Sequence, residues 1–271
     1  MVVEYDGTRY SGWQEQLNAR TVAGELRKAA CAVVHGPVEL DGAGRTDAGV
    51  HALAQVARLR TRSHASAAKL LSDLNRELPK DICVLSIEPA NPSFHPRHDA
   101  LRRYYTYQIC NRKTAFARPY VWWVREPLNL GSMQEAASLL IGRHDFERFS
   151  DKRAEEKSNV VVVEHVELRP MEDMLLLRIG ASHFLWKMVR RLVGAIVEVG
   201  RATITASDFA LFFQSAPLPK RLQGFSPAAH TAPASGLFLE KVVYNEEEED
   251  PGELRPAIPV RAFHRGDRRD R

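Results

Sequence analysis

The sequence predicts an α/β (α+β) protein made of two similar halves that share one β-sheet. Segments with helical spacing of apolar residues alternate with short runs typical of strands, and turn residues separate them. Within residues 1–90 these segments follow the order β-α-β-β-α-β, the ferredoxin-like arrangement, and residues 91–245 repeat this order loosely. We therefore expect two ferredoxin-like halves with a sheet shared across the middle and a cleft between them.

The first half contains two predicted helices. The helix at 21–34 begins at the N-cap Thr21 and stops before Gly36 and Pro37, and its apolar residues recur on one face. The helix at 66–78 turns a row of leucines inward in the same way. The four strands predicted for this half are 1–5, 38–40, 53–60 and 82–87.

The second half contains the longest predicted helix of the chain, at 184–199. Its apolar residues at helical spacing are Leu185, Met188, Val189, Leu192, Val193 and Ile196. The other predicted elements are strands at 104–110, 160–168, 174–179 and 237–244 and helices at 132–141 and 208–214.

Residues 246–271 differ in composition from the rest of the chain. An acidic run at 246–250 is followed by prolines and by the arginine-rich end RAFHRGDRRDR. Such a composition buries too little apolar surface to order itself, so we predict a disordered charged tail. The alternative is a tail that contacts RNA.

The overall composition is that of an ordinary globular chain, with 44% hydrophobic and 27% charged residues. No apolar run reaches the roughly 20 residues that span a bilayer, and the start lacks the zones of a secretory signal. The three cysteines (Cys31, Cys83 and Cys110) lack metal-ligand spacing. We expect a cytoplasmic protein with reduced thiols and no membrane or metal, and the net charge of +4 favours an anionic partner only weakly.

The stretch GAGRTDAGVHA, at 42–52, carries the strongest functional signal. It resembles the catalytic signature of the TruA family of tRNA pseudouridine synthases. Four more segments resemble further motifs of that family in the same order. They are EYDGTRYSGWQEQ (4–16), RRYYTYQI (102–109), FLWKMVRRLVGAIVEVG (184–200) and APASGLFLEKVVY (232–244).

The resemblance implies an isomerase that converts uridine to pseudouridine in tRNA, with positions 38–40 of the anticodon arm as the expected targets. It further implies two α/β halves with a mixed, largely antiparallel sheet and a homodimer that binds tRNA across both subunits. The reaction requires no metal and no small-molecule cofactor. One departure puts the target positions in doubt, because Val161 stands where many relatives carry an arginine.

Four residues receive catalytic roles from the resemblance. Asp47 is expected to be the nucleophile, and attack on the ribose and attack on the base both stay open. Arg45 is expected to hold the flipped-out uridine, since a stacked nucleotide hides its glycosidic bond. Tyr105 is expected to stack on the base and to take part in proton transfer, and Arg190 to form an ion pair that favours the ionised Asp47. His51 could act as an acid or base near the loop, but a structural role is preferred because the chemistry does not require a histidine.

The substrate-binding candidates are Tyr105, Arg45, Arg102, Leu185 and Met188. Alternation along the strand places Arg103, Tyr105 and Tyr107 on one face and Tyr104 on the other. We expect Tyr107 to support the core.

Five further residues near the site carry expectations. Gly42, Gly44 and Gly49 are expected to allow backbone angles that other residues avoid, and to let a nucleotide approach closely. Lys187 and Arg191 are expected to be solvated or to face phosphate.

Two other functional classes compete with this interpretation. The first is an RNA-binding protein that has kept the fold and lost catalysis, which would not need Asp47. The second treats GAGRTDAG as a phosphate-binding nucleotide loop. That loop lacks the Gly-Lys-Ser/Thr and GxGxxG patterns and precedes a strand, so we reject it.

Overall fold

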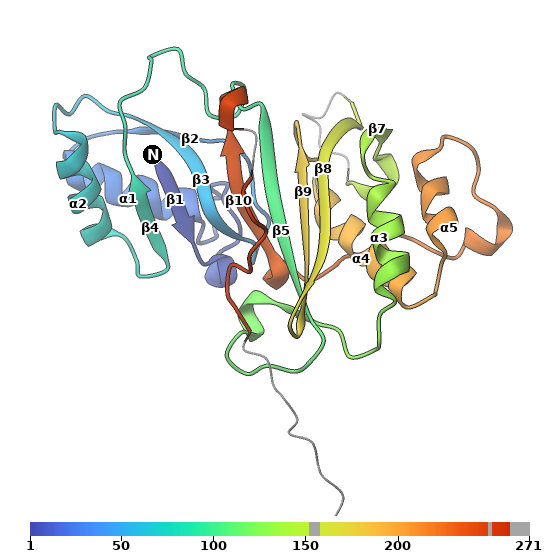
Figure 1. The fold of residues 1–271 in the computed structure, drawn as a ribbon. Coiled ribbons are helices and arrows are strands. Elements are labelled where there is room, and N and C mark those ends of the chain that lie inside the picture. Colours follow the sequence, from blue (N-terminus) through green and yellow to red (C-terminus); the bar gives the residue numbers. More distant parts are fainter. Residues whose placement is uncertain (152–157, 249–250, 261–271) are drawn as a thin grey trace, which may run out of the picture.

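The computed structural model describes residues 1–151, 158–248 and 251–260. Ten strands within these residues form one mixed sheet (Figure 1). They are β1 (Val2–Tyr5), β2 (Glu39–Gly42), β3 (His51–Arg60), β4 (Ile82–Ser86), β5 (Arg102–Cys110), β6 (Trp122–Trp123), β7 (Gly142–Asp145), β8 (Val160–Met171), β9 (Met174–Ala181) and β10 (Leu237–Val243). Their order is β4-β1-β3-β10-β5-β9-β8-β7, with β2 paired to β3 and β6 paired to β5. This arrangement confirms the predicted fold class and the shared sheet.

The helices pack against one face of that sheet (Figure 1). They are α1 (Val22–Val34), α2 (Ala67–Glu77), α3 (Leu130–Ser138), α4 (Met188–Gly200) and α5 (Ala206–Ala210). The predicted cap of α1 is present, because the Thr21 side chain accepts a hydrogen bond from the Gly24 backbone N–H. Apolar residues of α1 to α4 and of the strands beneath them form one continuous core across both halves.

The last strand in the sequence, β10, lies at the centre of the sheet, where the two halves meet. It runs parallel to β3, with Phe238 opposite His51, and antiparallel to β5, with Leu239 opposite Tyr105. The loop at 42–50 enters β3 on one side of β10, and the tyrosine strand β5 lies on the other side. Insertion of β10 therefore joins the halves and brings the two motifs together.

The helix predicted at 184–199 begins later than expected. The helix α4 starts at Met188, and Lys187 adopts the left-handed conformation with φ of 63°. The Trp186 carbonyl accepts from the Asp151 backbone N–H, so residues 184–187 form a connecting loop instead of a first helical turn. The short strands β6 and β7 were not predicted, because β6 has only two residues and β7, Gly-Arg-His-Asp, contains no apolar residue.

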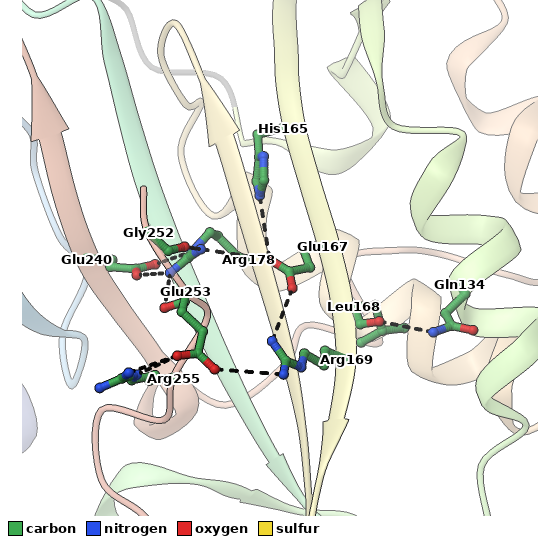
Figure 2. Close-up of polar contacts among 10 residues, drawn as sticks. All are labelled: Gln134, His165, Glu167, Leu168, Arg169, Arg178, Glu240, Gly252, Glu253 and Arg255. Atoms are coloured by element: carbon green, nitrogen blue, oxygen red, sulfur yellow. Dashed lines mark hydrogen bonds and ion pairs between the residues drawn. The ribbon is translucent and has the colours of Figure 1, made fainter. Parts of the chain in front are cut away.

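A charged network occupies the face of the sheet away from the helices (Figure 2). At its centre the Arg178 side chain is 1% exposed, and its Nε donates to Glu240 at 2.9 Å. Its Nη1 donates to the Gly252 carbonyl at 2.7 Å. Leu254 and Val260 are buried beside it, in a second apolar cluster with side chains of β5 and β9.

We call residues 251–260 the C-terminal strap, because they run across β10, β5 and β9 on this face (Figure 1). The prediction of disorder for 246–271 is therefore wrong for the strap. Two apolar side chains, together with a buried arginine that donates hydrogen bonds to its carbonyls, order a segment whose composition alone predicts disorder. Residues 249–250 and 261–271 of the predicted tail lie outside the described residues. None of the helices in the described part of the chain is long and apolar enough to cross a membrane.

Candidate active site

A cavity of about 430 Å³ lies where the two halves meet. The loop before β3, the strand β5 and the segment leading into α4 supply most of its wall. Asp47, Arg45, Tyr105 and Arg190, the four residues given catalytic roles from the sequence, all line this cavity. The fold thus brings together Asp47 and Arg190, which are 143 positions apart in the chain.

The loop that carries Asp47 rests on the segment at 10–13. The Thr46 carbonyl accepts from the Trp13 backbone N–H at 3.1 Å, and the Thr46 hydroxyl lies 2.8 Å from the Tyr5 hydroxyl. Gly12 has a φ of +93°, and a Cβ at this position would lie 2.5 Å from the Thr46 carbonyl oxygen. The glycine at position 12 therefore allows the backbone contact that fixes the loop.

The turn after Asp47 requires the glycine that follows it. The Val50 backbone N–H donates to the Asp47 carbonyl at 3.1 Å, and Gly49 adopts a φ of +78° within this turn. Gly42 has ordinary angles but would clash with the Trp13 ring if it carried a Cβ. The expectation of unusual angles is therefore confirmed for Gly49 and wrong for Gly42 and Gly44, where close approach or open space explains the glycine instead.

The Asp47 carboxylate is held by two donors from the second half. Arg190 Nη1 lies 3.5 Å from Oδ2, and the Trp186 indole Nε1 donates to Oδ1 at 3.0 Å. The side chains of Asp47 and Arg190 are each 18% exposed. One oxygen therefore faces a guanidinium and the other an indole N–H, in a half-buried setting where charge interactions are stronger than in water.

Arg190 is held in position by two hydrogen bonds to the backbone of Ala232. Its Nε donates to the Ala232 carbonyl at 2.7 Å, and its own carbonyl accepts from the Ala232 backbone N–H at 3.0 Å. A Cβ at Gly194, one helical turn further on, would lie 1.6 Å from the His230 carbonyl oxygen. The helix α4 can therefore press against the segment before β10, which directs the guanidinium toward Asp47.

Tyr105 presents its ring to the cavity from β5. The side chain is buried, and its ring meets Phe184 edge-on with 5.0 Å between centroids. Burial raises the pKa of Tyr105 well above its ordinary value, the Arg103 guanidinium opposes this rise and the Asp47 carboxylate adds to it. The phenol therefore stays protonated at neutral pH and can donate a hydrogen bond.

The neighbours of Tyr105 follow the predicted alternation. Tyr107 is fully buried and donates to the Pro233 carbonyl at 2.8 Å, as a supporting residue would. Arg103 shares the cavity side and donates to the Ala43 carbonyl at 2.9 Å, which ties β5 to the loop at 42–50. Tyr104 packs on the opposite face against His165.

Of the remaining substrate-binding candidates, Leu185 and Met188 line the cavity and are buried. Arg102 does not line it. Its guanidinium pairs with Glu164 and approaches the Tyr104 hydroxyl on the other face of the sheet, because it stands one position away from Arg103.

Lys187 and Arg191 both pair with one carboxylate; Lys187 is partly exposed and lines the cavity, whereas Arg191 is buried and departs from the expectation of a solvated side chain. Lys187 Nζ lies 2.7 Å from Asp151, and the buried Arg191 guanidinium contacts the same carboxylate. This three-residue cluster anchors the end of the segment at 145–151 to the start of α4.

His51 has the structural role that the sequence favoured. Its Nδ1 accepts from the Gly7 backbone N–H at 3.1 Å, which leaves Nε2 to donate to the Pro119 carbonyl at 3.1 Å. Burial lowers the pKa of His51, and its ring stacks on Phe238. The imidazole thus bridges two backbone groups, and its Nδ1 also lies 3.2 Å from the Asp6 carboxylate.

Several residues of the site were missed by sequence reasoning. Trp186, the indole donor to Asp47, lies inside the recognised motif at 184–200, but its direction depends on the loop before α4. Phe184 also lines the cavity. Across the described residues, no group of three or more histidine, cysteine or acidic side chains is arranged to hold a metal ion.

Comparison with known proteins agrees with this geometry. A family model described as tRNA pseudouridine synthase matches residues 1–99 and 136–245, which include Asp47 and Arg190, and Tyr105 lies between the matched segments. tRNA pseudouridine synthase A of Thermoanaerobacter sp. (strain X514) is 42% identical over 246 residues, covering 90% of this chain and 98% of the relative. The protein of that name from Methylococcus capsulatus (strain ATCC 33009 / NCIMB 11132 / Bath) is 36% identical over 247 residues, covering 90% and 89%.

Among solved structures, one chain of "Crystal Structure of a Cbf5-Nop10-Gar1 Complex" aligns with 73% of this chain and 44% of its own length. The TM-score of 0.34 and the identity of 10% are too low to add to the assignment. The family model and the relatives suffice, and the chain belongs to the tRNA pseudouridine synthase family.

Proposed function

We propose that this protein converts uridine to pseudouridine at positions 38–40 of the tRNA anticodon arm, with Asp47 as the nucleophile. The observation that carries the proposal is the Asp47 carboxylate, held by Arg190 and Trp186 in a cavity between the two halves. A carboxylate fixed by two donors and facing a cavity is suited to form a covalent intermediate. Family membership supplies the reaction class.

The reaction detaches uracil from the ribose through the C–N bond, rotates the base and rejoins it through carbon. Asp47 forms a bond to the ribose or to the base, and its carboxylate is released again at the end. Tyr105 offers a ring for stacking and a protonated hydroxyl as donor. Arg45, an exposed side chain in the cavity wall, would hold the extruded nucleotide.

The target positions and the assembly belong to the proposal as well. We infer a homodimer that binds tRNA across both subunits in the cytoplasm and uses no metal or small-molecule cofactor. Val161, at the position where many relatives carry arginine, is fully buried in the core next to a cavity residue, Val160. A change of target would be expected to originate in this segment.

Pseudouridine mapping tests the proposal. Bulk tRNA from a TruA-deficient bacterium is incubated with wild-type protein and with Asp47→Ala. We expect new pseudouridine at positions 38–40 with wild type only, and a loss of roughly 10⁴-fold or more in the variant. The variant should keep its fold and its tRNA binding, because Asp47 contributes no core packing.

Other outcomes are equally informative. Turnover by Asp47→Ala at the wild-type rate would refute the nucleophile. Pseudouridine at other positions would retain the chemistry and reject the target. No pseudouridine, together with intact tRNA binding, would favour the RNA-binding alternative that has lost catalysis.

A further inference from the structure

A second cavity, of about 310 Å³, lies on the other side of Arg45. It shares Gly44, Arg45 and Arg97 with the catalytic cavity, so these residues form a ridge between the two. Its volume falls within the roughly 300–1,000 Å³ typical of small-ligand sites. The proposed reaction takes place in the first cavity and assigns no role to the second.

The charge of the second cavity favours an anion. Two carboxylates line it, and each is engaged by an arginine from outside the lining. Asp41 accepts from Arg58 Nε at 3.2 Å, and Glu15 accepts from Arg27 Nε at 2.8 Å. Arg45 and Arg97 bring two further guanidinium groups to the lining itself, and an anion can contact these groups.

A pair of aromatic rings lies in the same wall. His95 and His98 stand with ring centroids 4.3 Å apart, on a turn closed by hydrogen bonds from the His95 backbone N–H to Asp99 and from the Arg97 backbone N–H to His95 Nδ1. Imidazole rings stack on unpaired bases and donate hydrogen bonds to ribose or phosphate. The wall therefore combines positive charge with flat surfaces, as single-stranded RNA sites do.

The ridge has open space at Gly44, where an RNA strand could cross it. A Cβ on Gly44 would meet no protein atom within 4 Å, and Gly44 does not adopt a positive φ. A strand whose target nucleotide is extruded into the catalytic cavity must continue over the adjacent surface. Gly44 lines both cavities, so the open space at this residue borders each of them.

We propose that the second cavity is a subsite for the ribonucleotide next to the target uridine in the RNA strand. Its phosphodiester lies against Arg45 and Arg97, and its base lies against His95 and His98. This inference rests on the proposed function, and it adds a contact that selects the strand neighbouring the target.

The first test measures RNA affinity in the Asp47→Ala background, so that binding is read without turnover. The probe is a synthetic anticodon stem–loop RNA with uridine at position 39. Adding Gly44→Val or His98→Ala should each raise its Kd about tenfold. His64→Ala, which changes an exposed histidine away from both cavities, should have no effect. Unchanged Kd for both cavity variants, with unfolding curves like the parent's, would overturn the subsite.

The second test locates the contact on the RNA. Each phosphodiester flanking the target uridine is replaced in turn by an uncharged methylphosphonate, and Kd is measured with and without Arg97→Gln. At one flanking linkage the two changes should be less than additive, because each removes the same contact. Additive effects at every linkage would reject the assignment.

A free-nucleotide arm distinguishes the strand from a small ligand. Uridine monophosphate at millimolar concentration should not compete with the stem–loop RNA at this cavity. Competition that His98→Ala abolishes would assign the cavity to a free nucleotide and overturn the strand subsite. These binding results are independent of turnover, so absence of pseudouridine would count against the proposed function and not against the subsite.

Discussion

Two arginine–carboxylate pairs lie on opposite faces of the central sheet, and they differ in the burial of the arginine and in how closely it meets the carboxylate. Arg178 is 1% exposed, and it contacts both oxygens of Glu240 and the carbonyls of the C-terminal strap (Figure 2). The Thr106 hydroxyl also donates to Glu240. On the helix face, Arg190 meets Asp47 through one nitrogen at 3.5 Å, and both side chains are 18% exposed.

The difference separates a structural pair from a chemical one. A buried pair is tolerated when hydrogen bonds satisfy its polar atoms, and Arg178 and Glu240 obtain them from β5 and the strap. Asp47 contacts the Arg190 guanidinium and the Trp186 indole N–H, and it lines a cavity. We infer that the Asp47 carboxylate, which Arg190 contacts through one nitrogen at 3.5 Å, can react with a substrate in the cavity. The Glu240 carboxylate, held by the buried Arg178, has no such access.

We expect the largest loss of stability when the ion pair between Arg178 and Glu240 is broken. Glu240→Gln removes the nearer carboxylate partner of the buried Arg178 guanidinium and leaves Glu167, at 3.8 Å, as the other, and we expect the free energy of unfolding to fall by about 3 kcal/mol. Urea denaturation measures the change. Glu39→Gln, at an exposed pair, should change it by less than about 1 kcal/mol. A stability loss no larger than that of the control would mean that the Arg178–Glu240 pair does not hold this face.

The strap should contribute through its apolar side chains. Leu254 is 1% exposed in the second apolar cluster, so Leu254→Ala should cost about 2–3 kcal/mol of unfolding free energy. Leu17→Ala, at a fully exposed leucine, is the matched control. Calorimetry of both variants would show the difference, and equal melting temperatures would indicate that the strap does not pack in solution.

Loss of the Arg190–Asp47 ion pair should lower the reaction rate more than it weakens tRNA binding. Arg190→Ala should lower the single-turnover rate at saturating tRNA about 10²-fold, equivalent to about 2.7 kcal/mol, and weaken tRNA binding much less. Arg76→Ala, at an exposed arginine on α2, should leave the rate unchanged. An unaltered rate constant for Arg190→Ala would remove the ion pair from the mechanism.

The indole contact should make a smaller contribution. Trp186→Phe keeps an aromatic ring but removes the N–H donor to Asp47, and we expect kcat to fall about tenfold, equivalent to about 1.4 kcal/mol. KM for tRNA should stay within twofold of wild type. Trp123→Phe, at a half-exposed tryptophan outside the cavity lining, serves as control. A rise in KM without a change in kcat would assign Trp186 to binding instead of positioning.

The smallest expected effect is a pH dependence of stability that arises from His165, on the same face of the sheet as Arg178 and Glu240. Burial, with the nearby Arg178 guanidinium, lowers the pKa of His165. The unfolded chain therefore binds this proton more readily, and stability falls as pH drops below about 6.5, the ordinary histidine value. Urea denaturation between pH 7.5 and 5.5 should show this decline, and His165→Gln should reduce its slope. A variant with the same slope as wild type would exclude His165 as its source.

The sequence by itself determined the local features of this protein. Apolar periodicity predicted α1 and α2, Thr21 predicted the start of α1, and alternation along β5 separated Tyr105 and Tyr107 from Tyr104. These features depend on residues within a few positions of each other, where capping and side-chain direction are fixed by backbone geometry. The resemblance to family motifs singled out four further residues that line the first cavity: Arg45, Asp47, Tyr105 and Arg190.

Tertiary structure alone decided the contacts between distant segments. Trp186 reaches Asp47 across 139 positions, and Arg178 orders the strap by bonding Gly252 across 74. The position of β10 between β3 and β5, and the left-handed Lys187 that delays α4, also have no local signal. Each depends on which strands and helices bury one another, and that choice is made by the whole core at once.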